Sequence, residues 1–212
     1  MWKIGLCAAF LFVVAGTAHA AIMPYDVVTP GDPVWIVNGV DDGDGQAGDP
    51  PGAEGVEHAI DGNTQKYLNF KDLGSGFIVK PSVGSTIVTG LVFYTANDAE
   101  ERDPASYQLY GSNESETGLF TLIASGDLNL PAGRNGSGAA IAYPNTLYNE
   151  SVAFANTAAY AYYKVVFPTL KNAGAANSMQ IGEVDFHGVM PEPATLALLG
   201  LGGLVTLIRR RR

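Results

Sequence analysis

Between residues 21 and 190 the sequence consists of short β-prone runs, each bounded by Gly, Pro, Asn or Asp, with no long apolar stretch of helical period. Short runs separated by turn residues are typical of strands. About eight of them predict an all-β, two-sheet sandwich of jelly-roll type. The runs are Val34–Val37, Phe77–Lys80, Ile87–Thr95, Tyr107–Gly111, Phe120–Ser125, Val152–Phe154, Tyr160–Phe167 and Met179–His187.

Alternation within these runs indicates which side chains form the core. In the last run, Ile181 is out of phase with Val184 and Phe186, and a β-bulge near Gly182 would bring the three to one face. We expect Trp35 in the core as well. In the run Tyr160–Phe167, one face carries three large residues, namely Tyr163, Val165 and Phe167.

The first 20 residues have the three parts of a secretory signal peptide. Lys3 stands near the start, an apolar run extends from Ile4 to Ala15, and Ala18 and Ala20 form a small-x-small cleavage site. We therefore expect export and cleavage after Ala20. An uncleaved membrane anchor is the alternative.

The other end has a Pro-Glu-Pro motif, an apolar run and a basic tail. Pro191, Glu192 and Pro193 precede residues 194–208, which are followed by Arg209–Arg212. As a helix the apolar run covers roughly 22 Å, short of the ~30 Å hydrocarbon core, which suits a transient span of the inner membrane. Since arginines stay on the cytoplasmic side, residues 21–190 are expected outside it.

Residues 189–212, with this motif, span and basic tail in order, resemble the PEP-CTERM sorting signal. The resemblance implies an exosortase-type processing enzyme as partner, with Pro191, Glu192 and Pro193 as the processing motif. It also implies a Gram-negative bacterium that makes exopolysaccharide, and a place on the envelope surface or in the extracellular matrix. A plain tail anchor is the alternative.

Charge, cysteine content and the lack of catalytic motifs argue against three properties: nucleic-acid binding, a disulfide and enzyme activity. Residues 4–191 carry 7 basic and 20 acidic residues, so no basic footprint for nucleic acid exists. The only cysteine, Cys7, lies in the signal peptide, so the exported domain has no disulfide. Neither His58 nor His187 belongs to a metal-spaced pair, and no G-x-S-x-G or H-E-x-x-H motif occurs, which indicates a protein that is not an enzyme.

Three separated motifs connect the middle of the chain to a known family. The segments 59–64 (AIDGNT), 102–113 (RDPASYQLYGSN) and 181–184 (IGEV) resemble, in this order, motifs of discoidin or coagulation factor 5/8 type C domains. The resemblance covers residues 34–188, after a lead-in of residues 21–33. It implies a sandwich of galactose-binding type.

The same resemblance implies a structural calcium ion. Calcium takes carboxylate, carbonyl and hydroxyl oxygens. The residues implied as its ligands are Ala59, Asp61, Asn63, Thr64 and Glu183. An Asx-turn at Asp61-Gly62 without metal is the alternative, and the family pattern is broken by Lys66 and Leu68, of which the lysine would compete with a cation.

Sandwiches of this type present loops at one end for binding, here residues 41–57, 71–76 and 97–103. Sugar recognition needs an aromatic platform with hydrogen-bonding side chains beside it. The candidates are Tyr67, Asn69, Phe70, Lys71 and Arg102. We therefore expect a non-catalytic module that binds an extracellular polysaccharide or matrix component. The alternative is a structural or adhesive matrix protein that binds protein partners.

Overall fold

The computed structural model describes residues 25–38, 50–63, 65–71, 73–136 and 148–191. They form eleven strands and two short 3-10 helices, η1 (Val56–Ala59) and η2 (Glu100–Arg102). The strands are β1 (Tyr25–Asp26), β2 (Val34–Val37), β3 (Tyr67–Asn69), β4 (Ser75–Val79), β5 (Ile87–Tyr94), β6 (Ser106–Ser112), β7 (Thr121–Asp127), β8 (Asn149–Ala153), β9 (Tyr162–Phe167), β10 (Met179–Ile181) and β11 (Glu183–Val189).

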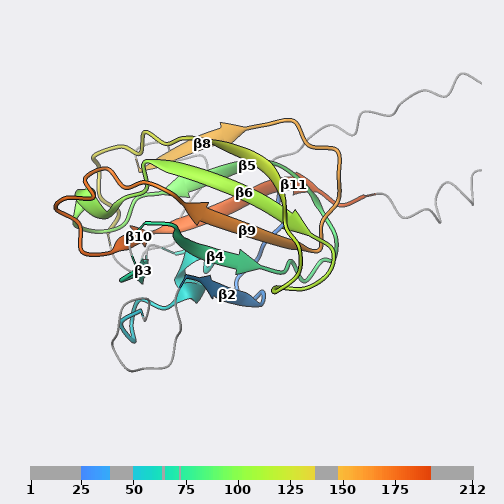
Figure 1. The fold of residues 1–212 in the computed structure, drawn as a ribbon, viewed down its shortest axis with the longest axis horizontal. Helices are drawn as coiled ribbons and strands as arrows, with labels where there is room; N and C mark the ends of the chain where they lie inside the picture. Colours follow the sequence, from blue (N-terminus) through green and yellow to red (C-terminus); the bar gives the residue numbers. More distant parts are fainter. Residues whose placement is uncertain (1–24, 39–49, 64, 72, 137–147, 192–212) are drawn as a thin grey trace, which may run out of the picture.

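Two antiparallel sheets pack face to face, as Figure 1 shows. One has four strands in the order β1-β11-β5-β8, and the other has five in the order β2-β4-β9-β6-β7. A short ladder of β10 with β3 lies beside them at one end. The predicted all-β jelly-roll sandwich is confirmed.

The core between the sheets follows the predicted alternation. Tyr163, Val165 and Phe167 of β9 are fully buried. Aromatic rings join the two layers. The ring centroids of Phe93 of β5 and Phe167 of β9 are 6.2 Å apart, and those of Phe186 of β11 and Phe77 of β4 are 6.1 Å apart. Such edge-to-face pairs add to the free energy gained from burial of the rings themselves.

The irregularity expected at Gly182 divides the last run into β10 and β11. The Gly182 amide donates a 2.9 Å hydrogen bond to the Tyr94 carbonyl, and an added Cβ would lie 2.4 Å from the Thr95 oxygen. Only glycine fits this close approach. Ile181, Val184 and Phe186 are all fully buried, as the bulge prediction required.

Two features differ from the sequence-based expectations. The lead-in contributes β1, which pairs with β11, and Val27 and Val28, which enter the core. The placement of Trp35 in the core is wrong, because Trp35 pairs with Ile78 on the outer face of the five-stranded sheet while its neighbour Ile36 pairs with the buried Phe77. Period 2 fixes that two neighbouring residues face opposite ways, but it does not say which faces inward.

The predicted signal peptide, with Ala18 and Ala20, and the predicted hydrophobic helix after Pro191 lie outside the described residues, as do Glu192 and Pro193. Within the described ranges, the structure has no helix with the length and apolar character that crossing a membrane requires.

Candidate functional site at the loop end

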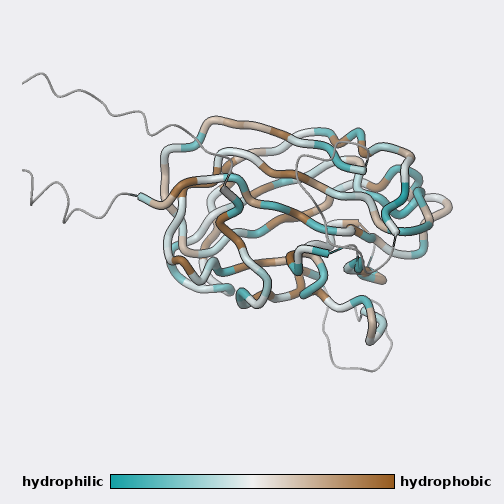
Figure 2. Tube along the Cα trace, turned by 180° about the vertical axis from the view of Figure 1, so that it is seen from behind, coloured by the Kyte–Doolittle hydropathy of each residue, from teal (hydrophilic) through white to brown (hydrophobic). Residues whose placement is uncertain are grey.

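The described loops that join β2 to β3, β3 to β4, β5 to β6, β7 to β8 and β9 to β10 gather at one end of the sandwich (Figure 1). Strand β11 begins there and finishes at the opposite end. Figure 2 shows many hydrophilic segments in these loops and apolar segments within the strands. We call this region the loop end. It brings together the described parts of all three loops predicted for binding, while residues 39–49 of the first loop lie outside the described residues.

The expected calcium loop forms an Asx-turn. Asp61 accepts a 3.0 Å hydrogen bond from the Asn63 amide through Oδ1, and its Oδ2 lies 2.6 Å from Nδ1 of His58. Gly62 between them has a φ of +72°, which favours glycine. The Asx-turn reading is therefore confirmed as geometry, and His58, which the sequence left without a role, is the partner of this carboxylate.

Glu183 reaches the same loop from the start of β11. Its Oε2 accepts a 3.0 Å hydrogen bond from the Gly62 amide, and its side chain is almost wholly buried. Burial, followed by the negative charge of Asp185, raises the pKa of Glu183 well above its usual value; the Gly62 hydrogen bond opposes this and the charge of Asp61 adds to it. Asp61 and Glu183 thus face one turn from two distant parts of the chain.

Two more carboxylates follow Glu183 along the outer face of the four-stranded sheet. Burial, with the charge of Asp185 next, raises the pKa of Asp26 to about 7, and burial raises the pKa of Asp185 to about 6. Tyr94 donates a 2.9 Å hydrogen bond to Asp185. We call Glu183, Asp185 and Asp26 the acidic row; no salt bridge joins any of them to a cation within the described ranges.

The donor set of this region fits a hard cation in its chemistry. Two carboxylates, Asp61 and Glu183, meet at a turn whose neighbours offer carbonyl oxygens, Ala59 is fully buried beside it, and uncompensated negative charge surrounds Glu183. Within the described ranges no three His, Cys, Asp or Glu side chains converge as metal ligands, so a cation here would depend on carbonyl or hydroxyl oxygens as well. Thr64 lies outside the described residues.

Lys66 does not oppose a cation at this turn in the way its position in sequence suggested. It is buried, and its ammonium group lies 2.6 Å from Asp98, 3.5 Å from Glu54 and 3.2 Å from the side-chain oxygen of Gln180. The positive charge is therefore held between two carboxylates of neighbouring loops. Leu68, the other departure from the family pattern, is a buried residue.

Two of the predicted sugar contacts are core residues instead. Tyr67 is fully buried and donates a 3.1 Å hydrogen bond to the Gly76 carbonyl, while the Asn69 amide donates a 2.8 Å bond to the Tyr67 hydroxyl. Their place on β3, which pairs with β10 over the core, explains the burial. As exposed platform residues, Tyr67 and Asn69 were wrongly predicted.

The other three candidates remain accessible at the loop end. Phe70 is partly exposed and Lys71 is exposed, both at the turn after β3. Arg102 ends η2 and is partly buried, with an Nε atom that is buried and has no hydrogen-bond partner among the described residues. Hydrogen bonds of the backbone connect these loops, since Gly74 donates to Phe167 and Asn172 donates to Glu101.

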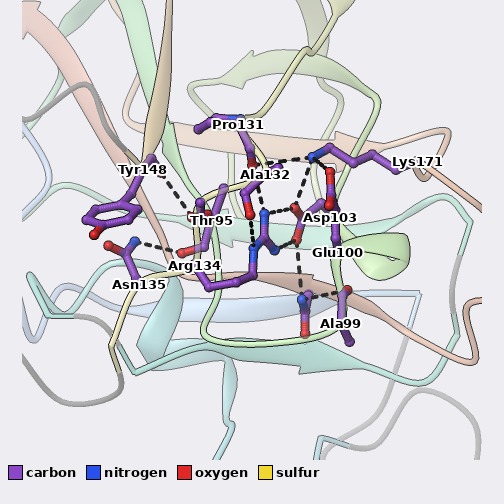
Figure 3. A network of polar contacts seen from close by, with 12 residues as sticks. Thr95, Ala99, Glu100, Asp103, Pro131, Ala132, Arg134, Asn135, Tyr148 and Lys171 are labelled. Carbon is purple, nitrogen blue, oxygen red and sulfur yellow. Dashed lines mark hydrogen bonds and ion pairs between the residues drawn. The ribbon is translucent and has the colours of Figure 1, made fainter.

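A polar network that the sequence did not predict connects the loops of this end (Figure 3). The fully buried Asp103 accepts bonds of 2.9 and 2.7 Å from the two terminal nitrogens of Arg134, and Lys171 lies 3.4 Å from the same carboxylate. Arg134 also donates to the carbonyls of Pro131 and Asp98. We call Asp103, Arg134 and Lys171 the clamp, because they tie three separate loops together.

Of the Asp103–Arg134 pair in the clamp, only Asp103 lies in a motif that the sequence shows. Asp103 belongs to the R-D-P motif, but the residue of this motif that we predicted to bind a ligand is the neighbouring Arg102. Arg134 stands alone in a loop of Pro, Gly and Asn, 31 residues away from its partner. Neither the composition of the two loops nor the periodicity of the strands predicts a contact between Asp103 and Arg134.

Comparison with known proteins agrees with both resemblances. Residues 191–212 match the PEP-CTERM protein-sorting motif. No curated protein sequence matches the chain. Among solved structures, the CBM32-1 and CBM32-2 domains of ZmpB from Clostridium perfringens match 78% of this chain with 37% of their own, at 15% identity and a TM-score of 0.54.

Two single modules give similar values. CBM32-3 from a family 31 glycoside hydrolase of Clostridium perfringens covers 66% of this chain and 85% of itself, with 14% identity and a TM-score of 0.51. Chitosan-binding module 1 from a chitosanase/glucanase of Paenibacillus sp. IK-5 covers 77% and 99%, with 14% identity and a TM-score of 0.50. The chain therefore has a galactose-binding-like jelly-roll fold and carries a PEP-CTERM sorting motif at its C-terminus.

Proposed function

We propose that this protein is an exported, non-catalytic binding module that is sorted to the cell surface and binds an extracellular polysaccharide at its loop end. The observation that carries the proposal is the fold, which is shared with modules whose names describe carbohydrate binding. The sorting motif supports export and processing by an exosortase-type enzyme of a Gram-negative envelope, with transient use of the inner membrane.

Phe70 and Lys71 are the residues that we propose for the sugar contact, with Arg102 beside them. Phe70 offers a partly exposed ring and Lys71 an exposed donor on the same turn. A sugar ring stacks on an aromatic face through its C–H groups, and the charged donors orient its hydroxyls. The buried Nε of Arg102, without a partner among the described residues, would gain one from a ligand oxygen.

We also propose that a structural calcium ion binds near the Asp61 turn, held by Asp61 and Glu183 with oxygens of Ala59, Asn63 and Thr64. The uncompensated charge around the buried Glu183 supports this. The ion would stabilise the turn that precedes β3, and so fix the position of Phe70 and Lys71.

Retention by polysaccharides tests the proposed function. The full-length protein, purified in a non-ionic detergent with calcium present, would be incubated with insoluble neutral polymers, chitosan and the host's exopolysaccharide. We expect retention on at least one polymer, and its loss in the Phe70→Ala/Lys71→Ala variant. Leu119→Ala is the matched control, because Leu119 is 82% exposed on a loop at the opposite end.

Either of two results would contradict the proposed function. The first is that no polymer retains the protein. The second is that the double variant and Leu119→Ala bind equally, because the site would then lie elsewhere. Capture of envelope proteins in the absence of polysaccharide would instead favour the structural or adhesive role.

A further inference from the structure

The outer face of the five-stranded sheet has a composition that neither the core nor the loop end explains. Strand pairing places one residue from each strand in a row across the sheet, and these residues share a face. In the order of the strands, this row is Trp35, Ile78, Lys164, Tyr110 and Leu122. Two aromatic rings and a lysine thus stand on a face that looks away from the core.

The rows on either side consist of uncharged residues in one direction and of an aromatic residue beside a lysine in the other. Toward the loop end the row is Val37, Gly76, Val166, Gln108 and Ser125, and toward the other end Tyr162 pairs with Ser112 beside Lys80. None of these residues is an aspartate or glutamate. The acidic residue that strand pairing adds to this face is Asp127, which pairs with Ser106 in the last row at the loop end. With Lys80 and Lys164 against Asp127, the face carries more positive than negative charge in a protein whose net charge is -9.

Each of the two lysines lies over aromatic rings. The ammonium group of Lys164 is 4.8 Å from the ring centroid of Tyr110 and 4.5 Å from that of Phe120, and the ammonium group of Lys80 is 5.4 Å from that of Tyr162. These distances are within the range of cation–π contacts. The ring centroids of Trp35 and Tyr162 are 6.2 Å apart, so Lys80 lies over one ring of an aromatic pair.

The lysines of this face differ from three other cations of the domain. Lys66, Arg134 and Lys171 each form salt bridges with carboxylates at the loop end. Within the described ranges Lys80 and Lys164 form none. Their charges are held in place by rings and remain available to an anion from outside.

We propose that this sheet face, defined by Trp35, Tyr110, Tyr162, Lys80 and Lys164, is a second binding surface, and that it takes an anionic polysaccharide with carboxylate groups. Aromatic rings present flat apolar surface to the C–H faces of sugar rings, and the two lysines pair with carboxylates along the polymer. Charge complementarity selects the acidic polymer over neutral ones.

The position of the face in the fold agrees with this occupant. Both β1 and β11, from which the chain continues to residues 1–24 and 192–212, belong to the other sheet. The five-stranded sheet is thus the layer from which neither end of the chain departs. The proposal concerns a surface distinct from the loop end and goes beyond the function proposed for it.

Affinity electrophoresis tests the proposal. The full-length protein in non-ionic detergent would be run through native gels containing sodium alginate, a polymer of uronic acids, or the same polymer after reduction of its carboxyl groups. EDTA is present, so that calcium does not take part. We expect retardation by alginate alone, weaker at high salt. Lys80→Gln/Lys164→Gln should raise the dissociation constant about tenfold, since each lost ion pair is screened by solvent.

Two further variants complete the test. Lys80→Arg/Lys164→Arg keeps charge and ring contact, so it should bind like wild type. Trp35→Ala should weaken binding of alginate without changing the salt dependence, because it removes a ring and no charge. Circular dichroism of each variant shows that the fold is kept.

The following results would overturn the proposal. Equal retardation by alginate and its reduced form would remove the role of charge, and unchanged binding by the Gln variant would remove the role of these lysines. Sedimentation that shows a dimer lost in Trp35→Ala would assign the face to a second copy of the chain. Binding to phosphatidylglycerol vesicles in place of alginate would assign it to a membrane.

Failure of the loop-end function would look different. Neutral polymers would then retain no variant at all, whereas retardation by alginate and its loss in the Gln variant would remain.

Discussion

The clamp lies at the loop end, and the acidic row begins there with Glu183 and continues along β11 to Asp26 of β1. Both groups contain a buried carboxylate, and their charges are balanced in opposite ways. Asp103, in the clamp, is fully buried and has Arg134 and Lys171 within 2.7 and 3.4 Å. Glu183, in the acidic row, is as deeply buried but has the carboxylates Asp185 and Asp61 as its charged neighbours. In the clamp, the negative charge of Asp103 is balanced by cations. In the acidic row, the negative charge exceeds what the described residues neutralise.

This difference indicates two roles for the same kind of residue. A buried carboxylate with its cations in place holds loops together, and its loss leaves the cations unpaired. A buried carboxylate among other carboxylates costs stability whenever it is ionised, and it is favoured by a bound proton or cation. We therefore expect removal of charge to harm the protein at the clamp and to help it in the acidic row.

The largest effect is expected from Asp103→Ala. The change leaves Arg134 and Lys171 facing each other without their shared partner, and loss of one member of a buried pair costs roughly 3–5 kcal/mol. Chemical denaturation followed by fluorescence measures the free energy of unfolding. The matched control is Glu100→Gln, which removes only the exposed partner of Lys171 and should change it little. A loss for Asp103→Ala no larger than that of Glu100→Gln would contradict the structural role of the clamp.

The second effect is the response of Glu183, the member of the acidic row at the Asp61 turn, to calcium. An ion that binds only the folded state stabilises it by about 2.7 kcal/mol at a hundred times its dissociation constant. Melting in calcium chloride against EDTA measures this, with magnesium chloride as control, because magnesium gives up its water reluctantly. The gain should be larger at pH 8 than at pH 5, since the pKa of Glu183 is raised and the ion binds the ionised form.

Glu183→Gln separates this calcium effect from a general effect of salt. The amide keeps an oxygen for the Gly62 hydrogen bond but removes the charge, so the stabilisation by calcium should disappear. A calcium response that is equal in wild type and Glu183→Gln would place the ion elsewhere.

The contrast between clamp and acidic row also shows how far sequence reasoning reaches. The strands at β2 and β5 and the inward face of β9 follow from period 2 and turn residues, and the structure has them. Glu183 near Asp61 came from a family resemblance, and the structure brings the two residues to one turn. The link between Asp103 and Arg134 came from neither, because it joins two loops whose paths depend on the whole fold.

Burial of polar side chains was the least predictable property. Tyr67, Asn69 and Phe70 are close in sequence and were all predicted to contact sugar. In the structure Tyr67 and Asn69 of β3 are buried, and of the three only Phe70 is partly exposed. Trp35 shows the opposite error, since a large aromatic residue was expected inside and lies on the outer face. In both cases the pairing partner of the strand decides the outcome, and sequence alone does not name that partner.

The smallest effect, and the sharpest test of the contrast, is expected from Asp26→Asn. Burial and the charge of Asp185 raise the pKa of Asp26 from 3.8 to about 7, so the folded state binds a proton that the unfolded state releases. Stability from this group is complete below about pH 4 and is lost as the pH rises to about 7. Asparagine carries no charge at any pH. It should therefore raise the free energy of unfolding at pH 8 by roughly 1–2 kcal/mol and leave it unchanged at pH 4.

The geometry allows this exchange without loss of contacts. The oxygen Oδ1 of Asp26 accepts the amides of Val28 at 3.1 Å and Phe186 at 2.9 Å, and the asparagine oxygen takes its place. Denaturation at a series of pH values would measure the difference between variant and wild type. A variant that is less stable than wild type at pH 8 would mean that the charge of Asp26 is compensated after all. The acidic row would then be a second clamp, and the distinction between the two regions would fail.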